Sequence, residues 1–186
     1  MKKKTFTLNV AGLTRELSIC PINDEISIAA FVMFSDVELT EKCTAELLKK
    51  VPDFDIVLTA ESKGIPLGYE MAKQSGKQYV VARKSVKLYM TDPISVEVKS
   101  ITTDYQQTLY LSAEDIVLMK GKRVLIADDV ISTGESLNAL MKLAEKAGCE
   151  VIAKAAVLAE GDAAYRNDII FLQELPIFKT DDKEKA

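Results

Sequence analysis

Short, unbroken apolar runs recur along this chain, and segments of helical periodicity separate them. Such runs predict strands buried on both faces of a parallel sheet, because they offer no polar face to water. The periodic segments predict helices that cover the sheet. The predicted strands are residues 54–60, 78–84, 123–129, 151–159 and 168–172, and the predicted helices are residues 41–51, 65–74 and a segment from Leu137 to just before Gly148. The fold class that follows is α/β, with an open, mostly parallel sheet flanked by helices, and ligands bind such sheets beyond the carboxyl ends of the strands.

The length of 186 residues suits one domain, residues 1–186, better than two. Residues 1–50 precede the first predicted sheet strand, and they are expected to form a hairpin over residues 5–20, with its turn at Ala11-Gly12, followed by helices. Residues 85–119 are rich in Thr, Ser and Val, alternate with a period of two and show no helical stripe. This segment predicts a β-ribbon, or flexible flap, inserted between the sheet units.

Composition removes several classes of protein. The chain has no histidine, which excludes Ser-His-Asp triads, Cys-His dyads and zinc sites with imidazole ligands. A net charge of -4 disfavours nucleic acid as a partner. The three cysteines, at positions 20, 43 and 149, fit neither a disulfide framework nor a CxxC metal pair. Because no apolar stretch is long enough for a signal peptide or a membrane span, we expect no membrane association and a cytoplasmic location.

The most specific chemistry lies where the apolar run 123–129 ends. Two adjacent carboxylates, Asp128 and Asp129, are followed by a loop of hydroxyl and glycine residues that opens a helix. Loop amides at a helix N-terminus form an anion cradle that suits a phosphate monoester, and the carboxylates can accept hydrogen bonds from a vicinal diol. A ribose 5-phosphate offers both groups; the structural alternative is an acidic turn followed by a capped helix. The residues of this candidate ribose and 5-phosphate site are Asp128, Asp129, Ser132, Thr133, Gly134, Glu135 and Ser136.

Residues 124–136 resemble the phosphoribosyl diphosphate (PRPP) signature of the type I phosphoribosyltransferases. Residues 59–68 (TAESKGIPLG) and 81–88 (VARKSVKL) resemble segments of the adenine phosphoribosyltransferase group, and residues 97–102 (EVKSIT) are similar to a segment of bacterial xanthine phosphoribosyltransferases. The resemblance covers residues 55–160 and is weak over the first 50. It implies the type I fold, with a small hood built from the N- and C-terminal segments, a homodimer, and Mg²⁺ as the cofactor.

The resemblance also implies a pyrophosphate site, because PRPP releases pyrophosphate from C1 and charge builds on the leaving oxygens. Its candidate residues are Ser62, Lys63, Gly64, Arg83, Lys84 and Lys87. For the last three, the alternative is a solvated cationic strand end. Glu61 is expected either to orient the pyrophosphate loop or to cap the following helix. Magnesium would be held through PRPP oxygens, with Asp128 as a candidate contact and no set of direct protein ligands assigned.

Two departures from the family pattern bear on the nucleobase. Ser132 stands where hypoxanthine-guanine enzymes carry an aspartate near the purine, which points away from them. Adenine enzymes carry Glu-Tyr-Gly in the flap, where this chain has Asp104-Tyr105-Gln106. The catalytic candidates are therefore Asp104, as proton donor to the base, and Asp129. For Asp104 the alternative is an ordinary exposed flap residue.

The function that the resemblance implies is a purine phosphoribosyltransferase of nucleotide salvage. It would join a free purine base, adenine first, to PRPP and release pyrophosphate. Two alternatives stay open: a xanthine or other 6-oxopurine phosphoribosyltransferase, and a non-catalytic regulator that senses PRPP or nucleotides. A phospho-acceptor receiver domain on a similar sheet is disfavoured, because it has no need of a Ser-Thr-Gly phosphate cradle.

Overall fold

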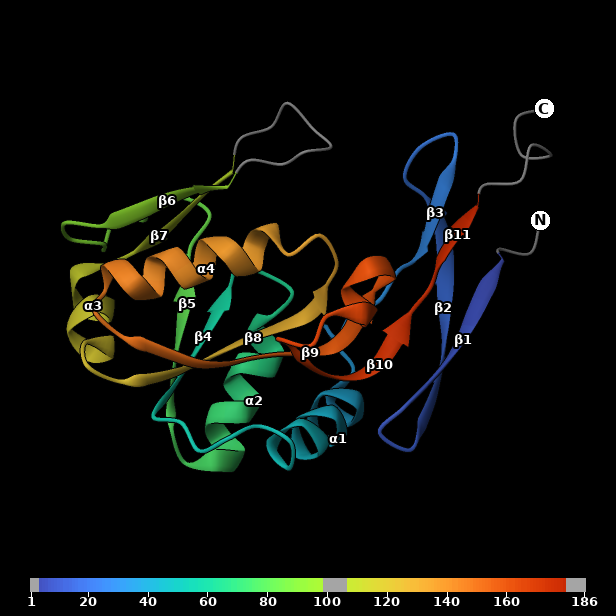
Figure 1. The fold of residues 1–186 in the computed structure, drawn as a ribbon, viewed down its shortest axis with the longest axis horizontal. Helices are drawn as coiled ribbons and strands as arrows, with labels where there is room; N and C mark the ends of the chain where they lie inside the picture. The colour runs from blue at the N-terminus through green and yellow to red at the C-terminus, as the bar shows by residue number, and fades with distance from the viewer. Residues whose placement is uncertain (1–3, 99–106, 180–186) are drawn as a thin grey trace.

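The computed structural model describes residues 4–98 and 107–179. Its centre is a five-stranded, fully parallel sheet in the order β10-β9-β8-β4-β5 (Figure 1). The strands are β4 (Ile56–Ala60), β5 (Gln78–Ala82), β8 (Arg123–Ile131), β9 (Glu150–Glu160) and β10 (Ile170–Leu175). All five predicted strands are therefore confirmed, and so is the α/β fold class.

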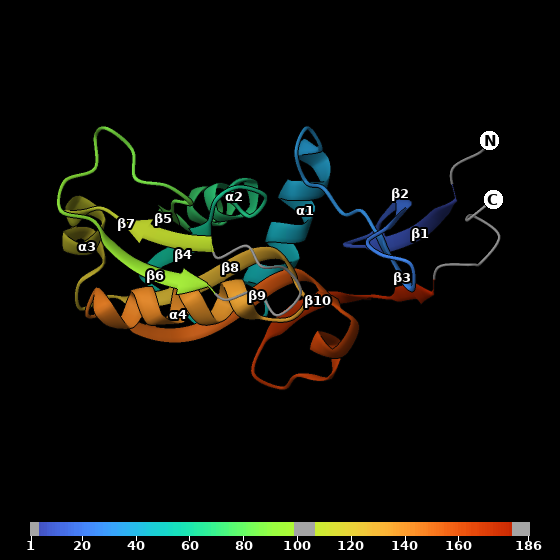
Figure 2. The ribbon, with the colours of Figure 1, turned by 90° about the horizontal axis from the view of Figure 1, so that it is seen from above.

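Helices cover both faces of this sheet. Helices α1 (Val37–Leu48) and α2 (Ile65–Ser75) lie on one face, and α4 (Glu135–Lys146) lies on the other (Figure 2). Helix α1 begins four residues before the predicted start at residue 41, because the Asp36 side chain caps it by accepting a hydrogen bond from the Leu39 N–H at 3.1 Å. The two other predicted helices agree closely with α2 and α4.

Alternate residues of each strand pack into two separate cores. Ile56 and Leu58 of β4 face the α4 side, whereas Val57 between them faces the side of α1 and α2. All three side chains are buried. The alternation explains why the strands read as continuous apolar runs: neither face of the sheet meets water.

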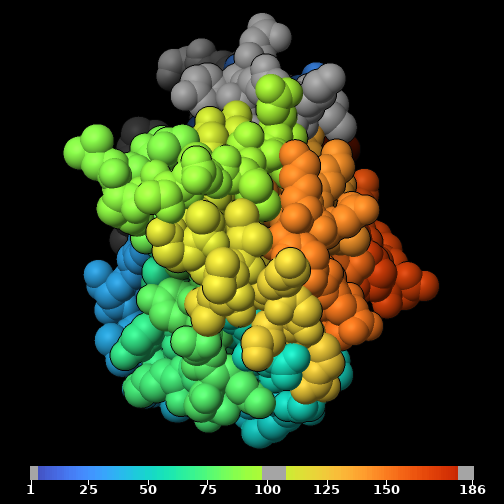
Figure 3. Space-filling view, turned by 90° about the vertical axis from the view of Figure 1, so that its left-hand side faces the viewer, coloured from blue at the N-terminus to red at the C-terminus, as the bar shows by residue number. Residues whose placement is uncertain are grey.

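The segment predicted as a flap contains more than a ribbon. Strands β6 (Ile94–Val98) and β7 (Gln107–Leu111) pair antiparallel, as expected, and pack beside α4 (Figure 3). Residues Ala113–Met119, however, form helix α3, so the prediction of no helix over residues 85–119 was wrong. Ser112 and Asp115 form a reciprocal capping box that starts this helix.

A second sheet joins the two ends of the chain. It has the order β1-β2-β3-β11, with strands β1 (Thr5–Val10), β2 (Leu13–Pro21), β3 (Ile26–Ala29) and β11 (Ile177–Lys179). The predicted hairpin is β1 and β2. Its turn falls at Ala11-Gly12, where both residues have positive φ, the geometry of a tight hairpin turn. A 3-10 turn, η1 (Gly161–Tyr165), follows β9. The four-stranded sheet β1-β2-β3-β11 is the hood that the resemblance implied.

Candidate active site

The candidate site lies where the strand order reverses. The chain moves from β4 to β5 on one side and later returns to place β8 on the other side of β4. Loops that follow two such strands diverge and leave a crevice, the usual ligand site of an open α/β sheet. A cavity of about 420 Å³, called the acid cleft below, lies at this point. Its lining residues are Ala60, Glu61, Ser62, Lys63, Lys84, Leu109, Asp128, Asp129, Val130 and Ser136.

The two carboxylates at the end of β8 have unequal surroundings. The Asp129 N–H donates to Asp128 Oδ1 at 2.9 Å. Asp129 is 3% exposed, and its Oδ2 atom is buried without a hydrogen bond from any described residue, although Lys63 Nζ lies 3.2 Å away as an ion pair. Burial, and then the negative charge of Asp129, raise the pKa of Asp128 well above its usual range. A buried carboxylate oxygen that has an ion-pair partner but no hydrogen bond can still accept hydrogen bonds from a ligand.

The loop after β8 leaves a helix N-terminus open. Ser132 and Thr133 are exposed, and Gly134 stands at the N-cap of α4 with a left-handed φ of 80°. Among the described residues, no side chain makes a capping hydrogen bond at this end. The alternative interpretation, in which a Ser or Thr hydroxyl caps α4, is therefore not what the structure shows. Ser136, in the first turn, lines the acid cleft.

The loop after β4 packs directly against the acid pair. It contains a cis peptide bond between Glu61 and Ser62, and Gly64 lies close to Asp128. A Cβ atom on Gly64 would lie 2.8 Å from Asp128 Oδ1 and would collide with the Thr59 hydroxyl. Only glycine therefore allows this loop to approach so closely.

The predicted cations divide into two groups. Lys63 and Lys84 line the acid cleft. The side chains of Arg83 and Lys87 instead reach Glu61, at 3.9 Å and 3.8 Å. Glu61 also accepts a hydrogen bond from the Lys84 N–H at 2.9 Å, and so links the end of β4 to the end of β5. Glu61 thus does not cap α2, whose N-cap is Gly64 without a side-chain bond.

The sequence analysis did not predict two residues that lie at the site. Glu160, the last residue of β9, is half-buried; burial raises its pKa, and the charge of Lys63 opposes the rise. It follows directly after the predicted strand 151–159, so an acid at a strand's carboxyl end was a signal available in the sequence. Arg166, whose guanidinium lies against Gly134, gave no local signal.

The flap candidates Asp104, Tyr105 and Gln106 lie outside the described residues, and so does most of the xanthine-like segment 97–102. The described strand β7 does reach the site, because Leu109 lines the acid cleft. The ribbon of β6 and β7 therefore borders the acid cleft.

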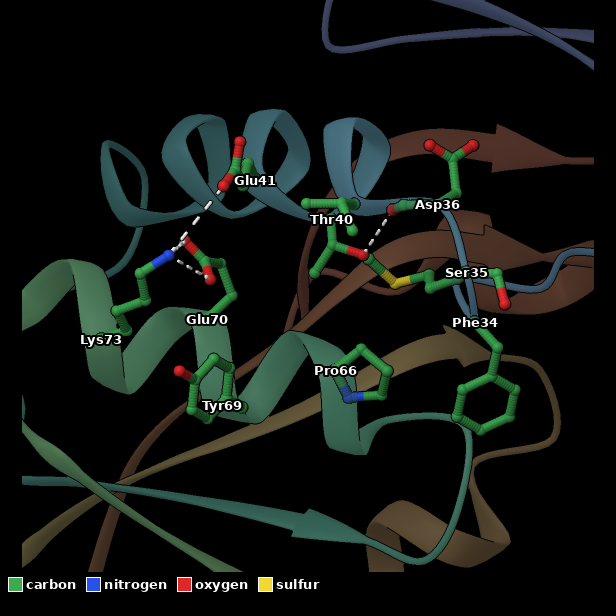
Figure 4. Close-up of a pocket in the computed structure, with 11 residues that line it drawn as sticks. Phe34, Ser35, Asp36, Thr40, Glu41, Pro66, Tyr69, Glu70 and Lys73 are labelled. Atoms are coloured by element: carbon green, nitrogen blue, oxygen red, sulfur yellow. Dashed lines mark hydrogen bonds and ion pairs between the residues drawn. The ribbon is translucent and has the colours of Figure 1, made fainter.

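A second pocket, of about 280 Å³, lies between α1 and α2, away from the predicted site residues (Figure 4). Phe34, Pro66 and Tyr69 give it an apolar wall. At its other end Lys73 Nζ lies 3.2 Å from the buried Glu70 and 3.9 Å from Glu41. Because these charges are already paired, the pocket offers a ligand mainly an apolar surface.

The described residues contain neither a cluster of metal-binding side chains nor a membrane-spanning helix. Within residues 4–98 and 107–179, no group of three or more acidic or cysteine side chains could hold a metal ion. No helix in this part of the chain is long and apolar enough to cross a membrane. The cytoplasmic location stays a prediction.

Comparisons with known proteins agree with this geometry. Residues 38–182 match the model of the phosphoribosyl transferase domain. The adenine phosphoribosyltransferase of Rhodococcus jostii is 36% identical over 68% of this chain and 69% of its own length, and that of Thermotoga petrophila is 39% identical over 55% of this chain and 58% of its own. The hypoxanthine/guanine phosphoribosyltransferase of Methanococcus voltae is 33% identical over 77% of this chain and 71% of its own.

A solved structure shows the same fold. The adenine phosphoribosyltransferase of Thermoanaerobacter pseudethanolicus superposes with a TM-score of 0.70, covering 85% of this chain and 95% of that one, at 23% identity. The family model spans most of the chain, and the sheet with its helices and hood is the type I architecture. The chain belongs to the phosphoribosyl transferase domain family, within its type I group.

Proposed function

We propose that this protein transfers the ribose 5-phosphate of PRPP to a free purine base, adenine first, releasing pyrophosphate. The observation that carries the proposal is the acid cleft itself. It combines a buried carboxylate oxygen without a hydrogen bond, on Asp129, with a helix N-terminus that no described side chain caps. A ribose 5-phosphate supplies hydroxyl donors for the first and a phosphate for the second.

The roles of the residues follow from their positions. Backbone amides of residues 132–136 hold the 5-phosphate at the N-terminus of α4, and Asp128 and Asp129 accept hydrogen bonds from the ribose hydroxyls. As pyrophosphate leaves C1, positive charge develops on the ribose, and the buried Asp129 carboxylate stabilises it. Asp104 as the proton donor to the base stays a prediction.

Pyrophosphate would lie on the loop after β4. Ser62 and the amide of Gly64 donate hydrogen bonds, and Lys63 and Lys84 neutralise the developing charge. Lys63 pairs with Asp129, so it must exchange this partner for the pyrophosphate when PRPP binds. Arg83 and Lys87 contribute indirectly. Their ion pairs with Glu61 fix the side chain that links the ends of β4 and β5 beside the acid cleft.

The donor set fits magnesium dependence. Two carboxylates at one strand end, without a third acidic ligand among the described residues, suit an ion held largely by substrate oxygens and water. When bound, Mg²⁺ would neutralise charge on the pyrophosphate, and Asp128 is the protein group we propose beside it. Its raised pKa agrees with a carboxylate that needs a cation.

The choice of base is proposed from relatives and from one residue. Relatives named adenine phosphoribosyltransferase are the most similar in identity among those described above, and a yeast enzyme of this name has been solved with adenine bound. Ser132 in place of an aspartate also favours adenine. The Methanococcus relative, named for hypoxanthine and guanine, supports a 6-oxopurine as the second candidate.

Pyrophosphate release from PRPP and Mg²⁺ tests the proposal, with adenine, guanine, hypoxanthine, xanthine, uracil and orotate assayed in parallel. We expect release with adenine. Release only with a 6-oxopurine would replace adenine by that base. Tight PRPP binding in calorimetry without release for any of the six bases would instead support the regulator, which the altered flap sequence at Asp104 still leaves open.

We further propose a homodimer, formed through the face that carries α1 and α2. Large apolar side chains are exposed on α1, α2, β5 and the loops before α1 and after β5: Phe34, Val37, Tyr69, Tyr79, Val86, Leu88 and Tyr89. Tyr69 and Tyr79 already stack edge to face, with ring centroids 6.0 Å apart. An apolar surface that extends over several elements is typical of an interface between subunits.

Light scattering tests the homodimer. We expect twice the chain mass of 20.5 kDa for the wild type and the monomer mass for Leu88→Ser with Tyr89→Ser. Tyr165→Ser, which removes an even more exposed aromatic ring from η1, away from the proposed interface, is the matched control and should remain dimeric. A monomeric wild type would refute the proposal.

A further inference from the structure

A guanidinium group lies against the phosphate loop from outside the acid cleft. Gly134, the left-handed residue before α4, is buried, and a Cβ atom on it would lie only 2.5 Å from Arg166 Nη1 and 3.7 Å from its Cζ. Arg166 follows η1 and comes from the end of the chain that builds the hood. The guanidinium therefore fills the space that a side chain at position 134 would need.

The Arg166 side chain is held in place by its other nitrogens. Nε and Nη2 donate to the two carboxylate oxygens of Asp168, each at 2.9 Å. Lys154 Nζ donates to the same carboxylate at 2.6 Å. These cations hold the pKa of Asp168 well below its usual range, so the carboxylate stays charged. Nη1, the nitrogen that faces Gly134, has no hydrogen bond to a described residue.

The phosphate loop needs a cation that it does not carry. Residues 132–136 contain hydroxyls, a glycine and the acidic Glu135, but no Lys or Arg. A phosphate monoester brings a charge of about -1.5 to -2, and a helix N-terminus offers only about half a positive charge. Arg166, Lys154 and Asp168 together leave one net positive charge beside the loop.

We infer that Arg166 is a positioning residue for the 5-phosphate. It supports Gly134 in its left-handed conformation, so that the loop amides converge, and it places a positive charge behind them. It acts through the loop backbone and not by touching the substrate. This inference rests on the proposed function, because it presumes that the loop holds a phosphate.

Calorimetry with two separate probes tests it: ribose 5-phosphate, and pyrophosphate with Mg²⁺. For Arg166→Met we expect the Kd of ribose 5-phosphate to rise about tenfold or more, and the Kd of pyrophosphate to change by less than about twofold. Arg166→Lys should recover part of the loss, because it restores the charge without the fork. In turnover, Arg166→Met should raise the KM for PRPP and leave the KM for the base unchanged.

The matched control is Arg15→Met. Arg15 makes the same kind of fork, donating to Asp36 at 2.7 Å and 3.1 Å, but far from the phosphate loop, in the hood. Arg15→Met should leave the Kd of ribose 5-phosphate and the Kd of pyrophosphate unchanged. Should Arg166→Met fail to fold, Arg166→Gln, which removes the charge but keeps a polar N–H donor on a shorter side chain, carries the same expectation for ribose 5-phosphate.

Each outcome decides the matter. Unchanged ribose 5-phosphate binding in a folded Arg166→Met variant would overturn the inference alone. If Arg166→Met weakened the binding of both probes equally, Arg166 would have a general structural role, and the inference would be overturned as well. Failure of the wild type to bind ribose 5-phosphate at all would refute the proposed function itself, and is distinguishable because it does not depend on Arg166.

Discussion

The acid pair should make the unligated protein less stable as the pH rises. Burial, and then the charge of Asp129, raise the pKa of Asp128, and burial raises the pKa of Glu160. A carboxyl group whose pKa is raised in the folded state binds its proton more tightly there than in the unfolded state. Its contribution to stability is therefore complete at low pH and is lost as the pH rises through the raised pKa. Carboxyls with a lowered pKa, such as Asp55 and Asp168, titrate below this window. The chain has no histidine to add a transition.

Asp128→Asn isolates this effect. The amide oxygen can still accept the hydrogen bond that the Asp129 N–H donates to Oδ1 at 2.9 Å, so the change removes the charge and little else. Each unit by which a carboxyl pKa is raised costs the charged protein about 1.4 kcal/mol of unfolding free energy. We therefore expect the variant to be more stable than the wild type by at least about 1.4 kcal/mol near pH 8, and this advantage to shrink steadily as the pH falls toward the ordinary Asp pKa of about 4.

Urea unfolding from about pH 5 to about pH 8, followed by circular dichroism, measures the difference. The matched control is Asp168→Asn, because Arg166 and Lys154 lower the pKa of Asp168 and its carboxylate is partly exposed. That variant should lose up to about 1 kcal/mol, evenly across the range. A less stable Asp128→Asn near pH 8, or a wild type whose stability rises with pH, would refute the reasoning.

Three further changes probe the same site. Asp128→Asn combined with Asp129→Asn should abolish calorimetric PRPP binding while the circular dichroism spectrum stays native; unchanged affinity would remove the acid pair from the site. Gly64→Ala, whose Cβ would lie 2.8 Å from Asp128 Oδ1, should lower kcat/KM for PRPP by about tenfold or more, because the pyrophosphate loop must move away from the acid pair; wild-type kinetics would contradict the close approach. Lys63→Met should lower thermal stability, because it leaves the buried Asp129 carboxylate without its ion-pair partner, and should weaken Mg²⁺-pyrophosphate binding clearly; intact pyrophosphate binding would exclude Lys63 from that site.

The sequence by itself determined the parts that local patterns encode. Continuous apolar runs placed β4 and β8, and helical periodicity placed α2 and α4. The acid pair and the loop of residues 132–136 were also readable, because strand, carboxylates, glycine and helix follow one another along the chain. Helix α3 was missed because only Met119 of its seven residues is buried, so it has no apolar stripe to read.

The tertiary structure alone decided which distant residues meet. The strand order brings the loops after β4 and β8 together, and no local pattern states this order. Glu61 holds the Lys84 backbone across 23 residues, and Arg166 reaches Gly134 from the far side of β9. Contacts of this kind depend on the packing of whole elements, because each side chain is polar and unremarkable in its own segment. They acquire a role only when the fold carries them to the edge of the sheet where the acid pair lies.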